Sequence, residues 1–286
     1  MGNAIDGLVD YLVIGHLTRD LTPGGASLGG TVSYASVTAR ALGLRVGMVT
    51  SWDERLPLGG LEDIPIVNRK VPQSTTFQNI ETPNGRRQTI FAVAEGLEYS
   101  DIPAPWQNAR FIHLGPVAQE VSPMLCSRFP TALVGVSPQG WLRVWDADGH
   151  VLPMDWDDFK QTDHYRCLAE ADITIISIED VGRVDQRVND LAAVCSILAV
   201  TDAANGSFLY WQGRVTHYPA PKVSESDPVG AGDVYATAII YRLHHTQDPF
   251  EAARFATHLA AYSVTRRGLD SVPTHAEIDH ALKGVF

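Results

Sequence analysis

The 286-residue sequence contains little cysteine, few basic residues and no long apolar run. Cys126, Cys167 and Cys195 are widely spaced and form no C-x-x-C pair, which gives no sign of a zinc or thiol-redox site and favours a reducing cytosol. The 22 Lys and Arg residues are scattered and outnumbered by 33 Asp and Glu residues, so nucleic acid is not expected as a partner. The apolar stretch near the start is too short to span a membrane, and its acidic residues do not suit a signal peptide. We therefore expect a cytoplasmic protein without a membrane partner.

Three well-known catalytic and binding motifs are also missing. The sequence has no G-x-x-x-x-G-K-[ST], no H-E-x-x-H and no G-x-G-x-x-G, which argues against P-loop, zincin and Rossmann dehydrogenase chemistry. Asp146 and Asp148 suggest a calcium loop, but the required Gly at its sixth position and Glu at its twelfth are absent. This pair of acids is therefore expected to belong to a polar hairpin.

The sequence does contain a series of short apolar runs. Residues 8–14, 45–50, 111–114 and 132–136 are expected to be strands, and residues 33–42 a helix. Residues 172–177 and 196–201 read as apolar strands separated by a helix, the pattern of a parallel sheet with crossover helices. The second half is thus α/β.

Two predicted hairpins interrupt this alternation of strands and helices. Residues 75–91 place β-favouring stretches on both sides of Pro83-Asn84-Gly85, a strong turn signal. Residues 208–218 predict a second hairpin that turns at Gln212-Gly213. Two helices are expected after it, over residues 230–245 and 250–267, with Gly268 as a C-cap.

The strongest chemical signal is the run D-P-V-G-A-G-D at residues 227–233, followed directly by an apolar helical stretch. Pro228 biases Asp227 away from the helical region, while Gly230 and Gly232 permit close backbone approach. The helix that follows begins with N–H groups that have no partner within it, and such an end binds anions.

Asp233 lies in the first turn of that helix, where its charge would repel an anion unless it had another task. A base that activates a hydroxyl beside a transferring phosphoryl group is such a task. The alternative is that Asp227 and Asp233 merely cap the helix. Five fixed positions should arise by chance in roughly one chain in several thousand, which favours the functional interpretation.

At these residues the sequence resembles the PfkB carbohydrate kinases, the ribokinase-like family, whose signature is D-T-x-G-A-G-D. The resemblance implies that Asp233 is the catalytic base and that the amides of Gly230, Ala231 and Gly232 form an anion hole. Pro228 stands where the family has Thr.

The resemblance extends toward the beginning of the chain. Asp20 corresponds to an acid that contacts substrate hydroxyls in the family. Gly29 and Gly30 correspond to glycines that let the backbone approach the sugar, with Tyr34 at a position where the family has Asn. A solvated loop acid and a simple turn are the alternatives for these residues.

Further along, Ser177, Glu179 and Asp180 resemble the family's N-x-x-E segment, which implies contact with magnesium-bound phosphates, the metal being held mainly through water. An ordinary helix start is the alternative. Thr201 and Gly206 resemble the nucleotide-side V-T-x-G-x-x-G, although Ala203 replaces its first glycine, and Asp227 is assigned to the same side.

Three further residues indicate the chemical class of the acceptor. Phe77 in Thr75-Thr76-Phe77, together with Gln139 and Arg143 in Q-G-W-L-R, looks most like inositol-type polyol kinases of the family. Arg143 is also a candidate for offsetting charge on the transferred phosphoryl group, or else a surface arginine.

The resemblance implies one ribokinase-like domain over residues 1–286: a three-layer α/β/α fold with a central, mostly parallel sheet and a small β lid from about 16–30 and 70–93. It implies ATP-dependent phosphorylation of a small neutral polyol or sugar, with Mg²⁺ and a candidate monovalent cation. Nucleoside or other sugar kinases, and a catalytically silent metabolite-binding relative, remain alternatives. Monomer and homodimer both stay open.

Overall fold

The structure is a computed structural model that describes residues 7–82 and 85–284. Its main sheet has nine strands in the order β15-β14-β13-β12-β9-β8-β1-β4-β5. In chain order these strands are β1 (Tyr11–Ile14), β4 (Val46–Thr50), β5 (Ile66–Asn68), β8 (Phe111–Leu114), β9 (Leu133–Val136), β12 (Ile173–Ser177), β13 (Leu198–Thr201), β14 (Ser207–Trp211) and β15 (Arg214–Tyr218).

The strand directions confirm the expected mostly parallel sheet. Every neighbouring pair from β5 to β13 is parallel, and β14 and β15 continue the sheet as an antiparallel hairpin. In parallel strands the carboxyl ends meet at one edge, so the loops after β1, β9, β12 and β13 gather on the same side of the molecule.

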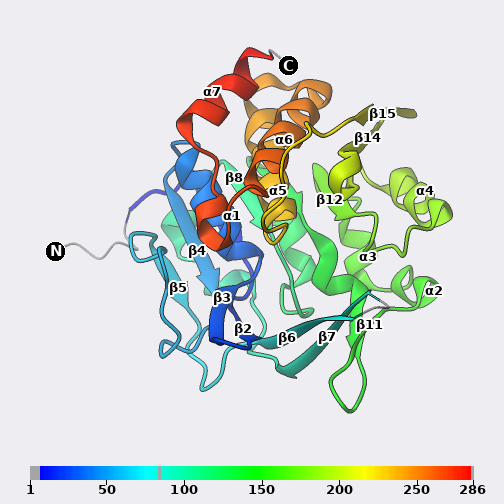
Figure 1. Cartoon of the computed structure of the whole chain (residues 1–286). Coiled ribbons are helices and arrows are strands. Elements are labelled where there is room, and N and C mark those ends of the chain that lie inside the picture. Colours follow the sequence, from blue (N-terminus) through cyan, green and yellow to red (C-terminus); the bar gives the residue numbers. More distant parts are fainter. Residues whose placement is uncertain (1–6, 83–84, 285–286) are drawn as a thin grey trace.

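Helices cover both faces of this sheet (Figure 1). The helices are α1 (Thr31–Ala41), α2 (Trp156–Phe159), α3 (Asp163–Cys167), α4 (Asp185–Val194), α5 (Ala231–Thr246), α6 (Pro249–Ser263) and α7 (His275–Lys283). None of the helices in the described residues is long and apolar enough to cross a membrane.

Two separate cores follow from the alternation of side chains along the strands. In β1, Tyr11 and Val13 pack with α1, α5, α6 and α7, whereas Leu12 and Ile14 pack on the opposite side with Trp106, Phe159 and residues of α4. The three-layer α/β/α arrangement expected from the sequence is confirmed.

A smaller, four-stranded sheet in the order β3-β2-β6-β7 lies outside these layers. Its strands are β2 (Thr18–Thr22), β3 (Gly25–Gly29), β6 (Thr76–Thr82) and β7 (Gly85–Ala92). They fall within the residues expected to form the lid, and β6 and β7 make the expected hairpin. Pro83 and Asn84 of the predicted turn lie outside the described residues.

The polar hairpin expected near Asp146 pairs β10 (Arg143–Trp145) with β11 (Val151–Pro153). A bridge between Thr89 and His150 brings this hairpin against β7, an extension of the lid region that the sequence did not predict.

The predicted C-cap at Gly268 is wrong, because α6 already ends at Ser263. The backbone carbonyl of Val264, the C-cap residue, accepts hydrogen bonds from the N–H groups of Ser226 and Asp227 at 2.7 and 3.0 Å. The loop that precedes α5 therefore captures the end of α6, and Gly268 begins the short 3₁₀ helix η7 (Gly268–Ser271).

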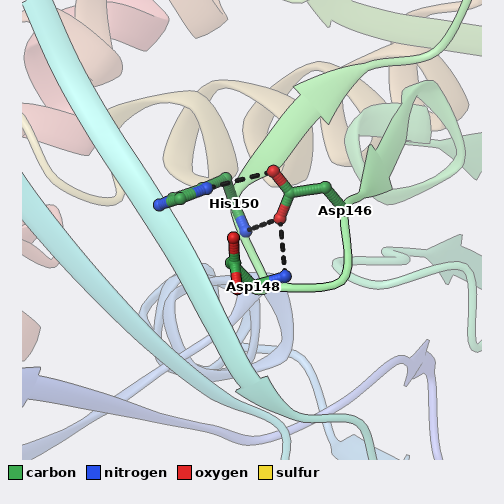
Figure 2. Close-up of side chains that lie close together, drawn as sticks. All are labelled: Asp146, Asp148 and His150. Carbon is green, nitrogen blue, oxygen red and sulfur yellow. Dashed lines mark hydrogen bonds and ion pairs between the residues drawn. The ribbon is translucent and has the colours of Figure 1, made fainter.

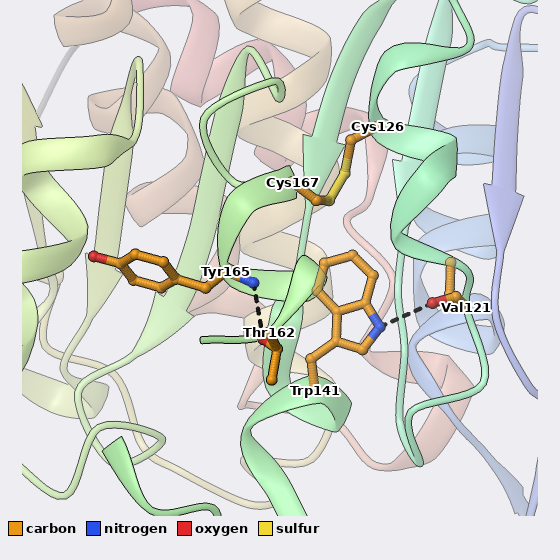
Figure 3. Close-up of a disulfide and its surroundings, with 6 residues drawn as sticks. All are labelled: Val121, Cys126, Trp141, Thr162, Tyr165 and Cys167. Atoms are coloured by element: carbon orange, nitrogen blue, oxygen red, sulfur yellow. Dashed lines mark hydrogen bonds between the residues drawn. A yellow bond between two sulfur atoms is a disulfide. The ribbon is translucent and has the colours of Figure 1, made fainter. Parts of the chain in front are cut away.

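A disulfide joins Cys126 of η4 (Pro123–Ser127) to Cys167 of α3, with their Cα atoms 5.7 Å apart (Figure 3). Beside it lies Trp141 of η5 (Pro138–Leu142), whose indole N–H donates to the Val121 carbonyl at 3.0 Å. The spacing of the cysteines favoured a reducing cytosol, where disulfides are rare, so this bridge across 41 residues was not predicted. The bridge holds together the segments that pack around η5.

Candidate active site

A cavity of about 240 Å³ opens where the carboxyl ends of the parallel strands meet the lid and the start of α5. This volume lies below the range of roughly 300–1,000 Å³ in which drug-sized ligands bind. The cavity therefore suits a small molecule. Its walls come from the lid, the start of α1, the ends of β12 and β13, the loop after β9, and the loop that leads into α5.

Asp233 borders this cavity in the first turn of α5. Burial raises the pKa of its carboxyl to about 6, the Thr31 hydroxyl lowers it by donating a hydrogen bond, and the nearby charge of Asp180 raises it further. A carboxylate with a pKa near neutrality is a better base than an ordinary aspartate and is still ionised at pH 7. Thr31 was not picked out from the sequence, and it orients this side chain from the start of α1.

The loop before Asp233 has the shape of an anion site. Gly230 adopts a left-handed conformation with φ of 83°, while an added Cβ on Gly232 would meet no atom within 4 Å. The backbone of α5 thus faces open space at Gly232. The N–H of Ala231, which was predicted to belong to the anion hole, instead donates to the Pro228 carbonyl at 3.3 Å, and the N–H of Val234 donates to the Gly230 carbonyl at 2.9 Å. The N–H groups that point outward at the start of α5 are therefore those of Gly232 and Asp233.

Tyr34 lies directly against this turn. A Cβ on Gly230 would collide with the Tyr34 ring, so the glycine leaves room for an aromatic side chain that also borders the cavity. Burial raises the pKa of the Tyr34 hydroxyl well above its usual range, and the charges of Asp233, Asp227 and Asp20 raise it further. The phenol therefore keeps its proton and can serve as a hydrogen-bond donor.

The lid contributes polar groups opposite Asp233. Asp20 accepts a hydrogen bond from the Thr18 hydroxyl at 3.0 Å, and Gly29 leaves the space that the Asp20 carboxylate occupies. Phe77 adds an apolar surface, and Gly30 caps α1 with φ of 89°. Asp20, Gly29, Gly30 and Phe77, all predicted to bind substrate, thus line the same cavity.

Asn79 and Gln88 also line the cavity, although the sequence analysis did not select them. They are cross-strand partners on β6 and β7, and the Gln88 amide donates to Asn79 Oδ1 at 2.9 Å. Asn79 is two residues after Phe77, so the alternation of a strand places both side chains on the same face. This two-residue alternation is the one feature of the sequence from which Asn79 could have been predicted.

The far wall carries Gln139, Arg143, Ser177 and Asp180. Asp180 Oδ1 accepts from the Gln139 amide at 3.2 Å, and Oδ2 accepts from the backbone N–H of Ser177 at 3.0 Å. Glu179 lies elsewhere, since its side chain is 71% exposed and pairs with Arg183 at 3.3 Å. Of the two predicted metal-site acids, the structure brings only Asp180 to the cavity.

Two residues assigned to the nucleotide side also lie off the cavity wall. Asp227 uses both carboxylate oxygens on backbone amides, accepting from Val229 at 3.0 Å and from Gly268 at 3.2 Å. Gly206 has φ of 97°, and a Cβ there would collide with the Tyr218 carbonyl. Both residues shape the loops, while Thr201 borders the cavity as expected.

A separate acidic group, Asp146, Asp148 and His150, brings its ligand atoms within 4.8 Å of one another (Figure 2). Asp146 is already occupied, because it accepts from the N–H groups of Asp148 and His150 and from the His150 ring, all at 2.9–3.0 Å. These bonds close the hairpin between β10 and β11.

Comparison with known proteins shows which family the chain resembles. Residues 150–276 match the model of the pfkB family carbohydrate kinases. A fructokinase of Escherichia coli is 26% identical over 220 residues, covering 68% of this chain and 69% of the fructokinase.

Two solved structures share the fold at low sequence identity. A pyrophosphate-dependent kinase of the ribokinase family, complexed with a pyrophosphate analogue and myo-inositol, has a TM-score of 0.76 at 18% identity, covering 95% of this chain and 99% of that one. A fructokinase of Xylella fastidiosa with bound ATP has a TM-score of 0.74 at 17% identity, covering 96% and 98%.

The family match contains Ser177 and Asp180 of the far wall and the whole D-P-V-G-A-G-D run, while Gln139 and Arg143 precede it. The shared fold covers 95% of the chain. On these grounds residues 150–276 form a pfkB family carbohydrate kinase domain, in a chain of ribokinase-like fold that is homologous to a fructokinase.

Proposed function

We propose that this protein transfers the terminal phosphoryl group of ATP to a hydroxyl of a small, neutral polyol or sugar, with Asp233 as the general base. The observation that carries the proposal is the position of Asp233, where the start of α5 meets a cavity walled on its other side by polar lid residues. Its pKa of about 6 leaves it ionised and basic at neutral pH.

Each part of the cavity has a role in this reaction. Asp233 accepts the proton of the attacking hydroxyl, and the N–H groups of Gly232 and Asp233 hold the phosphoryl oxygens. The lid keeps bulk water away from the transferring group, so that transfer to the acceptor outruns hydrolysis. Asp20, Asn79 and Gln88 orient the acceptor through its other hydroxyls.

A neutral acceptor follows from the charges around the cavity. Among the described residues that line it, Arg143 is the only cationic side chain, whereas Asp20, Asp180 and Asp233 are acidic. An acceptor that already carried a phosphate would meet this surplus of negative charge. An inositol-like polyol is favoured, since the pyrophosphate-dependent neighbour was solved with myo-inositol.

Pyrophosphate is a second candidate donor. The described residues on the donor side of the cavity, Ser177, Thr201, Val229 and Gly232, include no aromatic side chain on which an adenine could stack. The neighbour with a TM-score of 0.76 is a pyrophosphate-dependent kinase. Both donors present the same terminal phosphoryl group to the start of α5.

A donor-by-acceptor screen tests the proposal. ATP and pyrophosphate are each combined with a panel of inositols, pentoses, hexoses and nucleosides, and phosphorylated product is detected directly. We expect turnover of a polyol or sugar with ATP. Turnover with pyrophosphate and not with ATP would show that pyrophosphate is the phosphoryl donor. No product in any combination would favour a catalytically silent relative.

The Asp20→Ala variant should raise the acceptor KM by about ten- to a hundredfold, the effect of losing a hydrogen bond to a charged group. The donor KM should change little, because Asp20 belongs to the lid. Steady-state kinetics with each substrate varied in turn measures both values. Asp63→Ala, a change of an exposed aspartate, is the control. Equal increases in both KM values would remove Asp20 from acceptor binding.

Magnesium fits the far wall, because the Asp180 carboxylate and the hydroxyls of Ser177 and Thr201 are hard oxygen ligands. When bound, the ion would neutralise charge on the donor phosphates. Asp180→Ala should therefore raise the Mg²⁺ concentration for half-maximal rate by about tenfold or more. Glu179→Ala is the matched control, since Glu179 is exposed and paired with Arg183. Overlapping Mg²⁺ titrations for wild type and Asp180→Ala would place the metal elsewhere.

A further inference from the structure

The chain passes between the main body and the lid at several points, and three of them converge on His16. This residue links β1 to β2 and is fully buried. Its Nδ1 lies 2.7 Å from the hydroxyl of Thr75, just before β6, and its Nε2 lies 2.8 Å from the carbonyl of Glu95, just after β7. One imidazole ring thus ties together the two ends of the lid hairpin and the entry to β2.

The partners of the His16 ring indicate where its hydrogen bonds run. The Glu95 carbonyl can only accept, so Nε2 carries the proton. Thr75 Oγ1 already accepts the N–H of Ala94 at 2.9 Å, which leaves its own proton to donate to Nδ1. Both ring nitrogens of His16 are therefore held by hydrogen bonds at this junction.

Glu120 anchors the same junction from the body. Its side chain is buried, with 5% of the residue exposed. The carboxylate accepts from the backbone N–H groups of His16 at 3.0 Å, Val117 at 3.0 Å and Ala118 at 2.7 Å. Three backbone dipoles thus balance a buried charge, and one of them belongs to the lid junction.

The loop that Glu120 organises is also bound to the far wall of the cavity. The Pro116 carbonyl accepts the N–H of Gly140 at 2.9 Å, and a Cβ on Gly140 would collide with the backbone of Val117. The Gln119 side-chain amide donates to the backbone carbonyl of Arg143. Glu120 therefore connects the lid junction to the segment that carries Gln139 and Arg143.

We propose that Glu120, acting through His16, is a positioning residue that fixes the lid relative to the Gln139–Arg143 wall and so sets the acceptor end of the cavity. This inference rests on the proposed function for its effect on kinetics. The donor end is built on α5 and the ends of β12 and β13, which make none of these contacts. Glu120 should thus act on the acceptor and leave the donor unaffected.

Glu120→Gln is the sharpest test, because it keeps the size of the side chain and replaces one accepting oxygen with an N–H₂ group. At least one of the three backbone N–H groups then faces a donor in place of an acceptor. We expect the acceptor KM to rise about tenfold or more, with the donor KM within about twofold, as for loss of one charged hydrogen bond.

A second readout does not depend on activity. Hydrogen exchange of the backbone amides of β6 and the described part of β7 should become faster in Glu120→Gln without any substrate present. Asp172→Asn is the matched control, since Asp172 also accepts a backbone N–H, from Val134 at 2.7 Å, at the opposite end of the sheet. Its lid exchange should equal that of wild type.

Thr75→Val provides an independent approach to the junction, because it removes the hydroxyl that holds the His16 ring and keeps the shape. It should speed lid exchange like Glu120→Gln, and the double variant should show less than the sum of the two effects. Should Glu120→Gln not fold, Thr75→Val carries the same test. Unchanged lid exchange in the folded variants would overturn the inference, even if the proposed function holds. Faster exchange would support it even if no turnover were found.

Discussion

The Asp233→Asn variant is expected to lose about a thousandfold or more in kcat, within the range that a general base contributes. Asparagine has the same shape and can still accept a hydrogen bond from the Thr31 hydroxyl, so the side chain should stay in place. It cannot accept the proton of the acceptor. The backbone N–H groups at the start of α5 remain, so donor affinity should stay within a few fold of wild type. Single-turnover kinetics and donor binding by calorimetry measure the two effects.

The pH profile adds a test of the same residue. With a pKa of about 6, Asp233 should be half protonated near pH 6, and the rate of the wild type should fall below that pH. The residual rate of Asp233→Asn should lack this limb. A wild-type profile that stays flat down to pH 5 would contradict the assignment of Asp233 as the base, as would near-normal turnover of the variant.

Stability should change in the opposite direction to activity. Folding raises the pKa of Asp233 from 3.8 to about 6, so the folded state binds more protons between these values and loses stability as the pH rises through them. At pH 7 the buried, ionised carboxylate of Asp233 lowers the stability of the folded state. Asparagine carries no charge, so the variant avoids this loss of stability. Asp233→Asn should therefore melt at a higher temperature than wild type at pH 7, with the difference shrinking toward pH 4.

The sequence predicted the main body of this fold because its elements carry local signals. The short apolar runs gave most of the parallel strands, and residues 230–245 gave α5 almost to the residue. The run D-P-V-G-A-G-D places its glycines and acids at one helix start, so the donor end of the site is local in the chain. Here sequence spacing and spatial position coincide.

The acceptor end could not be read in the same way. Asn79 and Gln88 are polar residues in a hairpin rich in polar residues, and only the two-residue spacing between Phe77 and Asn79 marks the face that lines the cavity. Thr31 acts on Asp233 across about two hundred residues of chain, and Glu120 reaches His16 at a separation of 104 residues. Such contacts depend on how the lid lies over the body.

Motif resemblance also assigned residues that the structure places differently. Glu179 faces solvent with Arg183, while Asp227 and Gly206 shape loops through backbone contacts and a left-handed turn. A motif preserves a loop conformation as much as it preserves chemistry. The roles of residues within one motif must therefore be distinguished by the contacts that each residue makes. The two glycines of the anion site, Gly230 and Gly232, illustrate this.

Gly230 and Gly232 should respond oppositely to substitution, although they are two residues apart. An alanine at Gly230 would combine a left-handed φ of 83° with a collision against the Tyr34 ring. Strain of this kind destabilises by roughly 1–3 kcal/mol before the collision is counted. Gly230→Ala should thus lower the melting temperature, and adding Tyr34→Ala should recover part of the loss by making space for the new methyl group.

Gly232→Val should leave the fold intact, because an added Cβ there meets no atom within 4 Å and φ lies outside the left-handed range. The new side chain would instead occupy the space through which a phosphoryl group approaches the start of α5. We expect kcat/KM for the donor to fall about a hundredfold, comparable to the loss of one donor from an oxyanion hole. The melting temperature and the acceptor affinity should stay close to wild type. Thermal denaturation together with kinetics at varied donor concentration separates the two glycines, and normal donor kinetics in a folded Gly232→Val protein would move the phosphate site away from α5.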